Sequence, residues 1–227
     1  YVPLYGYYSE ETRQKLMAPD QLERRLDMWA RDYELTALEG TVELALEDSE
    51  DMSADLTYKL TTRRDLDHID FRITRLRRQA EYKDTRSPRM FINSIQDGEG
   101  NELTWVKIGA YSGLVVLPEE MPAGTKLTLR LQFMNKDSIY KLNPSYSAMD
   151  RGGWLPFVRF GDMHDMDLTI KVPKKYEVLG IGQKVEDREE GDVRVTRWVP
   201  KNPVDFPTVI YGVYKTATSD FAAKRAD

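Results

Sequence analysis

Residues 127–133 read Leu127-Thr128-Leu129-Arg130-Leu131-Gln132-Phe133, an unbroken alternation of apolar and polar side chains. Because successive side chains of a β-strand point to opposite faces of its sheet, this pattern predicts a strand with one buried and one solvated face. The same period of two recurs in residues 33–37, 42–46, 56–60, 69–73, 90–95, 104–108, 114–117, 168–172, 178–181, 193–199 and 209–214. Many short strands of this kind, several of them ended by Gly and Pro turns, predict an all-β fold: an antiparallel β-sandwich or saddle.

The first thirty residues have a different period. Ser9 is followed by two acids, as at the start of a helix, and Leu22, Leu26 and Trp29 are spaced to share one helical face. This pattern predicts two short N-terminal helices. We therefore divide the chain into a short helical N-terminal segment (1–30), a β-sandwich domain (31–215) and a linker towards a further domain (216–227).

Composition narrows the classes of function. The 227 residues include 41% hydrophobic residues, enough for a core, and the formal net charge is −5, which argues against a nucleic-acid or anionic-membrane surface. No apolar run approaches the roughly 20 residues that span a bilayer, so we expect no membrane span. The chain has no Cys, which excludes disulfides, thiolate catalysis and cysteine–zinc sites.

The start of the chain carries an expectation about its origin. It begins at Tyr1, with neither an initiating Met nor a signal peptide, so we expect a processed form or an excised fragment. The tyrosine-rich start is compatible with a removed export signal. The expected location is therefore an exported, periplasmic bacterial one.

No motif for catalysis stands out. Helical zinc-peptidase motifs place two His one turn apart beside a Glu, whereas this chain has only His68 and His164, far apart in sequence. It also lacks a phosphate-binding glycine loop and the nucleophile-elbow pattern of hydrolases. His68 lies in an alternating strand pattern, where a structural histidine is the expectation. The sequence predicts that this chain is not itself an enzyme.

The densest polar cluster is the weak candidate for a metal site. Asp162, His164 and Asp165 bring two carboxylates and an imidazole together just before the predicted strand 168–172. Adjacent residues on a strand point to opposite faces and rarely converge on one ion. Acidic residues also form turns at strand entrances. We expect a turn here and no metal, and keep these three residues as the alternative.

Two other functions remain open. A stand-alone β-sandwich would bind a protein or a carbohydrate through exposed aromatic side chains. A weaker option is a glycosidase, which needs a pair of carboxylates. The available pairs, Glu119-Glu120 and Glu189-Glu190, fall in predicted turns.

A specific resemblance begins at Asp150-Arg151-Gly152-Gly153-Trp154-Leu155-Pro156 and continues through Asp167-Leu168-Thr169-Ile170-Lys171-Val172-Pro173. Further elements follow in order, namely Tyr176–Gly180, the strand with Trp198, the turn Asn202-Pro203 and the closing Gly212-Val213-Tyr214. This succession, over about Tyr33 to Tyr214, resembles the N-terminal β-domain of the aminopeptidase N-like family of zinc metallopeptidases.

The resemblance implies a saddle-shaped β-sandwich that covers one side of a separate catalytic domain of the same polypeptide. It implies a non-catalytic accessory domain that shapes the substrate cleft and packs on that domain. No cofactor is expected in this chain, and zinc is expected only in the downstream catalytic domain, together with any peptide substrate.

The resemblance also singles out one residue on the substrate side. In the family an amide or acid side chain about nine residues before the proline helps to hold the amino terminus of the substrate. Counting back from Pro156 gives Ser147. A serine lacks the reach and charge to engage an ammonium group. This departure puts ordinary aminopeptidase activity in doubt and indicates a divergent relative.

Overall fold

The structure of the chain is a computed structural model. It describes residues 32–46, 51–72, 90–108, 112–136, 139–143, 145–149, 154–157, 163–205 and 207–214. The predicted N-terminal helices and the predicted linker 216–227 lie outside these residues.

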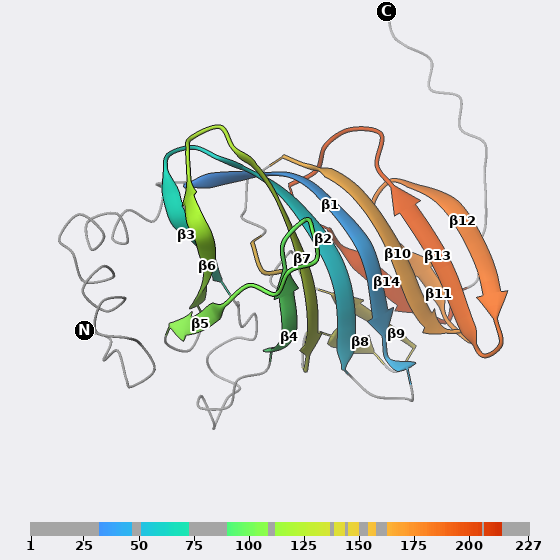
Figure 1. The fold of residues 1–227 in the computed structure, drawn as a ribbon. Coiled ribbons are helices and arrows are strands. Elements are labelled where there is room, and N and C mark those ends of the chain that lie inside the picture. Colours follow the sequence, from blue (N-terminus) through green and yellow to red (C-terminus); the bar gives the residue numbers. More distant parts are fainter. Residues whose placement is uncertain are drawn as a thin grey trace, which may run out of the picture.

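Within the described residues, fourteen strands form three sheets (Figure 1). The seven-stranded sheet has the order β12 (Gln183–Glu190), β13 (Val193–Val199), β10 (Asp165–Pro173), β1 (Tyr33–Leu44), β2 (Met52–Thr62), β7 (Lys126–Asn135) and β4 (Met90–Gln96). Behind it lies a four-stranded sheet of β11 (Glu177–Leu179), β14 (Val209–Gly212), β9 (Tyr146–Met149) and β8 (Ile139–Asn143). A three-stranded sheet of β3 (Leu66–Arg72), β6 (Ser112–Met121) and β5 (Trp105–Ile108) adjoins one end. The predicted all-β class is confirmed.

One strand pair departs from the predicted antiparallel arrangement. β1 and β10 run parallel, in a register from Ala37 beside Asp165 to Glu43 beside Lys171. Parallel neighbours need a long crossover connection, which the chain between β1 and β10 supplies. Alternating side chains mark a strand but carry no information on its direction, so the sequence pattern could not show this pairing.

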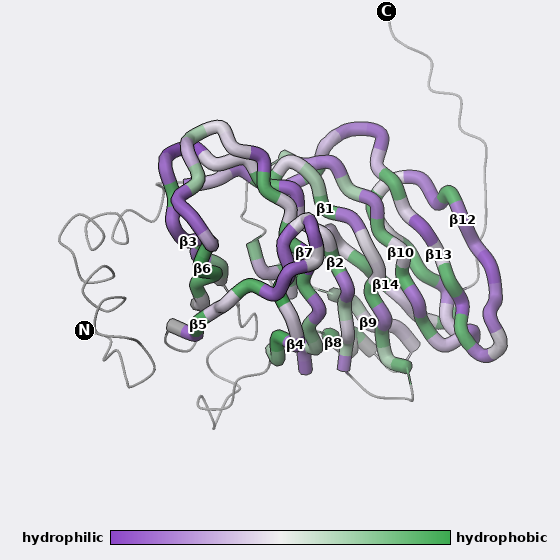
Figure 2. The backbone as a smooth tube through the Cα atoms, in the orientation of Figure 1, coloured by the Kyte–Doolittle hydropathy of each residue, from purple (hydrophilic) through white to green (hydrophobic). Residues whose placement is uncertain are grey.

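The large sheet forms because its strands separate apolar from polar side chains, as the hydropathy colours of Figure 2 show. In β2, Leu56, Tyr58 and Leu60 are buried, while Asp55 and Lys59 lie on the other face. β1 is one strand, although the sequence pattern was split at Gly40. A Cβ at Gly40 would lie 2.2 Å from the carbonyl oxygen of Asp55, so only glycine permits this close approach of β2.

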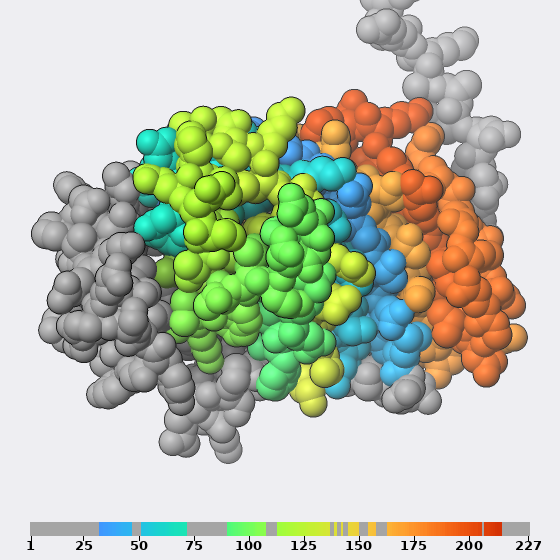
Figure 3. All heavy atoms as spheres, in the orientation of Figure 1, coloured from blue at the N-terminus to red at the C-terminus, as the bar shows by residue number. Residues whose placement is uncertain are grey.

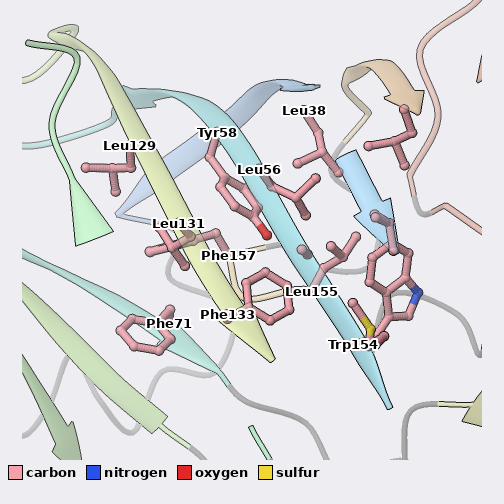
Figure 4. Close-up of a cluster of buried hydrophobic side chains, with 14 of the residues drawn as sticks. Leu38, Leu56, Tyr58, Phe71, Leu129, Leu131, Phe133, Trp154, Leu155 and Phe157 are labelled. Atoms are coloured by element: carbon pink, nitrogen blue, oxygen red, sulfur yellow. The ribbon is translucent and has the colours of Figure 1, made fainter. Parts of the chain in front are cut away.

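A short segment fills the core between the sheets. Trp154, Leu155 and Phe157 are each at most 2% exposed, and Figure 4 shows them among the side chains of β1, β2 and β7. The Phe157 ring lies 5.1 Å from that of Tyr58 and 5.1 Å from that of Phe71. Phe157 has a φ of 62°, a conformation that a bulky residue keeps only where its surroundings hold it. The aromatic packing supplies that constraint.

Several elements were not predicted from the sequence. β12 has no buried residue, so its sequence shows no apolar alternation. The acids Glu119 and Glu120, expected in a turn, lie in β6. There the pairing of β6 with β3 has a register shift between the pairs Leu66–Met121 and His68–Val116. The side chains of residues 118–120, within this shift, are exposed. A strand without a buried face leaves no period to detect.

The turn after β4 covers part of the front of the large sheet. Asp97 orders this turn, because its carboxylate accepts hydrogen bonds from the backbone N–H groups of Glu99 and Asn101 at 2.8 and 2.9 Å. Gly98 in the turn faces Thr128 of β7. In Figure 3 this turn is among the green atoms in front of the β4 end of the large sheet.

Candidate functional site

The four-stranded sheet has one face turned to the core and one turned away from it. Val178, Tyr211 and Ser147 form a row of directly paired residues across β11, β14 and β9, and all three are buried. In the next row, Leu179 pairs with Ile210 and Ile210 pairs with Ala148. These three side chains are exposed or half-buried, so the second row lies on the outer face.

An aromatic pair extends this outer face. Tyr146 pairs with Gly212, and a Cβ at Gly212 would lie 2.4 Å from that of Tyr146, so Tyr146 covers the glycine closely. The Tyr146 ring lies 6.1 Å from the ring of Tyr214. The pKa of the Tyr214 hydroxyl is raised by burial and by the neighbouring Tyr146. We call Leu179, Ile210, Ala148, Tyr146 and Tyr214 the small-sheet outer face.

Exposed apolar side chains concentrate around this sheet. Among the described residues, eight large hydrophobic side chains are exposed. Four of them belong to the four-stranded sheet or directly follow it, namely Leu142, Tyr146, Leu179 and Val213. The much larger seven-stranded sheet carries two, Phe91 and Val185. Of these four residues, Tyr146 and Leu179 belong to the small-sheet outer face.

The outer face of the seven-stranded sheet has the opposite character. Cross-strand ion pairs cover it, such as Lys59 with Glu39 at 2.9 Å and Lys171 with Glu43 at 2.9 Å. Arg130 of β7 binds the Asp55 carboxylate of β2 through two nitrogens, at 2.7 and 2.6 Å. This guanidinium holds the pKa of Asp55 below its usual range. Such a face is stable in water and would be costly to desolvate.

Ser147, the predicted substrate-side residue, lies in β9. It is 8% exposed and shares the core-facing side of the strand with Met149. Its neighbours in β9 that face outwards are Tyr146 and Ala148. The role of Ser147 towards a substrate stays a prediction, and its hydroxyl is turned away from the small-sheet outer face.

The predicted metal candidates are not brought together. His164 is 1% exposed, and its backbone pairs with that of Val204 through two hydrogen bonds of 2.9 Å. Asp165, the first residue of β10, is exposed, as expected of a strand neighbour that points the other way. Asp162 lies outside the described residues. Over the ranges that the structure describes, no three His, Asp or Glu side chains are grouped closely enough to hold a metal ion.

The remaining polar candidates lie apart on the surface. His68 of β3 contacts Asp67 through Nδ1 at 2.5 Å, as expected for a surface histidine beside an acid. Glu119 and Glu120 are in β6, and Glu189 and Glu190 are at the end of β12, in a different sheet. The Arg188 guanidinium lies 2.8 Å from the carboxylate of Glu190. Within the described part of the chain, no helix is long and apolar enough to cross a membrane.

The sequence interpretation missed the aromatic pair of the small-sheet outer face. Tyr146 lies in a strand of four residues, which is too short for alternation to be recognised. The neighbouring Ser147 was the residue predicted to lie on the substrate side. Tyr214 was placed at the end of a strand but given no role. The available signal was the closing Gly212-Val213-Tyr214, in which glycine leaves room for a ring from the neighbouring strand.

The fold of the described residues matches part of the fold of solved M1 zinc metallopeptidases. The resemblance to aminopeptidase N-like zinc metallopeptidases that the sequence indicated is thereby confirmed at the level of the fold. No protein-family model matches the sequence. No curated protein matches it either.

The particular neighbours are solved structures of longer chains. An M1 zinc metallopeptidase from Deinococcus radiodurans matches with a TM-score of 0.65 and 16% identity, over 81% of this chain and 43% of that chain. A two-domain M1 zinc metallopeptidase bound to L-arginine gives a TM-score of 0.66 and 16% identity, with the same coverage of 81% and 43%. Yeast LTA4 hydrolase gives 0.60 and 14%, over 82% of this chain and 30% of that chain. The chain spans less than half the length of these neighbours.

Proposed function

We propose that this chain is a non-catalytic, N-terminal accessory domain of a divergent zinc-aminopeptidase-like metallopeptidase. It packs on a catalytic domain of the same polypeptide and contributes to the shape of the substrate cleft. The observation that carries this proposal is the match of four-fifths of this chain to less than half of each M1 metallopeptidase.

The chemistry of the described residues supports the non-catalytic part of the proposal. The fold family implies zinc, and the residues described do not fit it, because His164 is buried, Asp165 is exposed, and no three possible ligands are grouped among them. A structural or catalytic zinc needs three or four ligands that converge at roughly 2.0–2.3 Å. We therefore propose that the zinc is bound by a domain outside this chain, and we assign no step of a reaction to the residues described here.

The distribution of surfaces supports the accessory role. A domain that packs on another needs one apolar face that loses its contact with water in the interface. Its other faces can stay in water. The small-sheet outer face and the ion-paired face of the large sheet meet these two requirements. A carbohydrate-binding module would instead be expected to present aromatic rings as a flat, open platform. Tyr146 and Tyr214 are inclined by 34° to each other, and Tyr214 is partly buried.

Hydrolysis of aminoacyl fluorophores tests the proposed function. Three samples are compared: the 227-residue chain, the polypeptide encoded by the complete gene, and that polypeptide without residues 1–227. We expect no hydrolysis by the chain alone, and loss of activity or a changed preference for substrate length when residues 1–227 are removed. Hydrolysis by the 227-residue chain alone would contradict the proposal. So would unchanged activity and preference after the removal.

A further inference from the structure

We infer that residues 154–157, which we call the core segment, leave the core in a local opening while the three sheets stay folded. The inference concerns the interior of this chain and does not depend on the proposed function. It rests on how the core segment is held and on three local costs of its packed position, one in its backbone and two at buried polar groups.

Side-chain packing holds the core segment in place. The segment belongs to none of the three sheets, so no strand ladder fixes its backbone. Its side chains Trp154, Leu155 and Phe157 are nevertheless buried in the common core, as Figure 4 shows. The ring of Phe157 lies 5.1 Å from that of Tyr58 and 6.3 Å from that of Tyr33. A segment outside the ladders can open without breaking the strand pairing, as a local unit of lower stability than the sheets.

The backbone of Phe157 adds a cost to the packed position. Its φ of 62° lies in the left-handed region, where the Cβ atom of an L-residue comes too close to a neighbouring carbonyl oxygen. A bulky residue keeps this conformation only because the surrounding rings fix it. Once the core segment leaves the core, Phe157 can return to an ordinary backbone conformation, and this cost is released.

Two buried polar groups add the second and third costs. In the described part of the chain, the Tyr58 hydroxyl and the Trp154 indole N–H are buried and have no hydrogen-bond partner. Burial, and to a smaller extent the neighbouring Tyr33, raise the pKa of Tyr58 well above its usual range. A buried polar group without a partner loses its hydration without compensation. Opening returns both groups to water, because Trp154 moves with the segment and Tyr58 loses the cover of the Phe157 ring.

Other buried aromatic side chains show the usual arrangement. The Tyr33 hydroxyl donates a hydrogen bond of 2.7 Å to the backbone oxygen of Asp70. The indole N–H of Trp198 donates one of 3.0 Å to Oγ1 of Thr196. The unpartnered groups at the core segment differ from these. All three costs fall on one short segment and are released together when it opens, which lowers the free energy of opening below that of global unfolding.

Two buried leucines form a matched pair for the test. Leu155 of the core segment is 2% exposed, Leu131 of β7 is 0% exposed, and both belong to the same core cluster. The chain contains no cysteine, so Leu155→Cys and Leu131→Cys each introduce a single thiol into the 227 residues. The experiment measures how fast N-ethylmaleimide labels each thiol in native buffer and in low urea. Urea unfolding of each variant, followed by circular dichroism, gives the labelling rate that its own global unfolding allows.

We expect Leu155→Cys to be labelled at least about tenfold faster than its own global unfolding allows, with little dependence on urea, because a local opening exposes little surface. Leu131→Cys should be labelled at the rate of its global unfolding and with the urea dependence of unfolding. Labelling of Leu155→Cys at the rate and urea dependence of global unfolding would overturn the inference. Labelling of Leu131→Cys as fast as Leu155→Cys would overturn it too, since the opening would then not be confined to the core segment.

Two buried tyrosines test the polar cost whether or not Leu155→Cys folds. Both are 0% exposed and lie against Phe157. Tyr58→Phe removes a hydroxyl without a partner, whereas Tyr33→Phe removes one that donates to Asp70. We expect Tyr58→Phe to raise the urea midpoint of unfolding and Tyr33→Phe to lower it. A lowered midpoint for Tyr58→Phe would show that its hydroxyl has a partner in the packed state, and would overturn the inference.

Discussion

At the scale of single residues, the core depends on rings that lie across glycines. Phe71 of β3 pairs with Gly113 of β6, and a Cβ at Gly113 would lie 2.4 Å from Cζ of the Phe71 ring. The ring has little freedom to move, because it is 1% exposed and lies 5.1 Å from the ring of Phe157 and 6.2 Å from that of Trp105. Gly113 is therefore required by packing.

Substitution of this glycine tests the packing of the core. Gly113→Ala should destabilise the domain by about 1–3 kcal/mol, the usual cost of forcing an extra methyl into a well-packed core. Thermal unfolding followed by circular dichroism measures the effect. Gly98→Ala is the control, because its Cβ would lie 3.3 Å from the Cβ of Thr128 in an exposed turn. Equal unfolding temperatures for the two variants would contradict the packing described here.

Ser147 illustrates how far residue-level prediction reaches. Counting from Pro156 located a position in β9, a strand whose two faces have opposite environments. A shift of one residue exchanges the core face for the outer face. An approximate count along the sequence cannot distinguish these two faces. In β9 the side chains that point outwards are those of Tyr146 and Ala148.

At the scale of elements, the β12–β13 hairpin is held by charges on its surface. Arg194 of β13 donates to both carboxylate oxygens of Asp187 of β12, at 2.8 and 2.7 Å, and also contacts Glu177 of β11. The hydrogen bonds from Arg194 and the contact with Lys184 lower the pKa of Asp187 to about 2, against the opposing effect of partial burial. The guanidinium thus ties the edge of the large sheet to the small sheet.

This pairing predicts a pH dependence of stability. Because the folded pKa of Asp187 lies below its unfolded value near 3.8, its contribution is fully present above about pH 4 and is lost as the pH falls through about 2. The pair is in contact with solvent, which screens it, so the contribution is at most about 1 kcal/mol. Asp187→Asn should reduce the free energy of unfolding at pH 7 and flatten its fall between pH 4 and pH 2.

Urea unfolding at several pH values measures this dependence. Asp192→Asn, in the turn of the same hairpin, is the matched control because it changes the net charge equally. If both substitutions gave the same pH profile, net charge would explain the effect and the Asp187–Arg194 pair would not.

The elements that the sequence predicted well are those with one buried face. β2 and β7 alternate over their whole length and were recognised from that alternation. β12 was not recognised as a strand because both of its faces are exposed, and β8 and β9 are too short to show a period. The parallel pairing of β1 with β10 depends on the path of the chain in space, which local alternation does not encode.

At the scale of the whole molecule, the domain has two sheet faces of opposite character on one core. The large sheet turns its ion pairs to water, and the small sheet turns Leu179, Ile210 and Tyr146 outwards. The apolar residues of both sheets join in one core, with the segment 154–157 between them. Removing the apolar face from water is favourable, whereas removing the ion-paired face is costly. This difference is the one expected of a domain that is covered on one side only.

The central claim is that this chain carries structure and contacts but no metal chemistry. Native mass spectrometry of the purified 227-residue chain, after incubation with zinc and removal of the excess, tests it most directly. We predict the mass of the metal-free chain, because His164 is buried, Asp165 is exposed, and no three possible ligands are grouped among the described residues. One zinc ion retained by each chain would contradict the claim and would make the region around His164 a metal site.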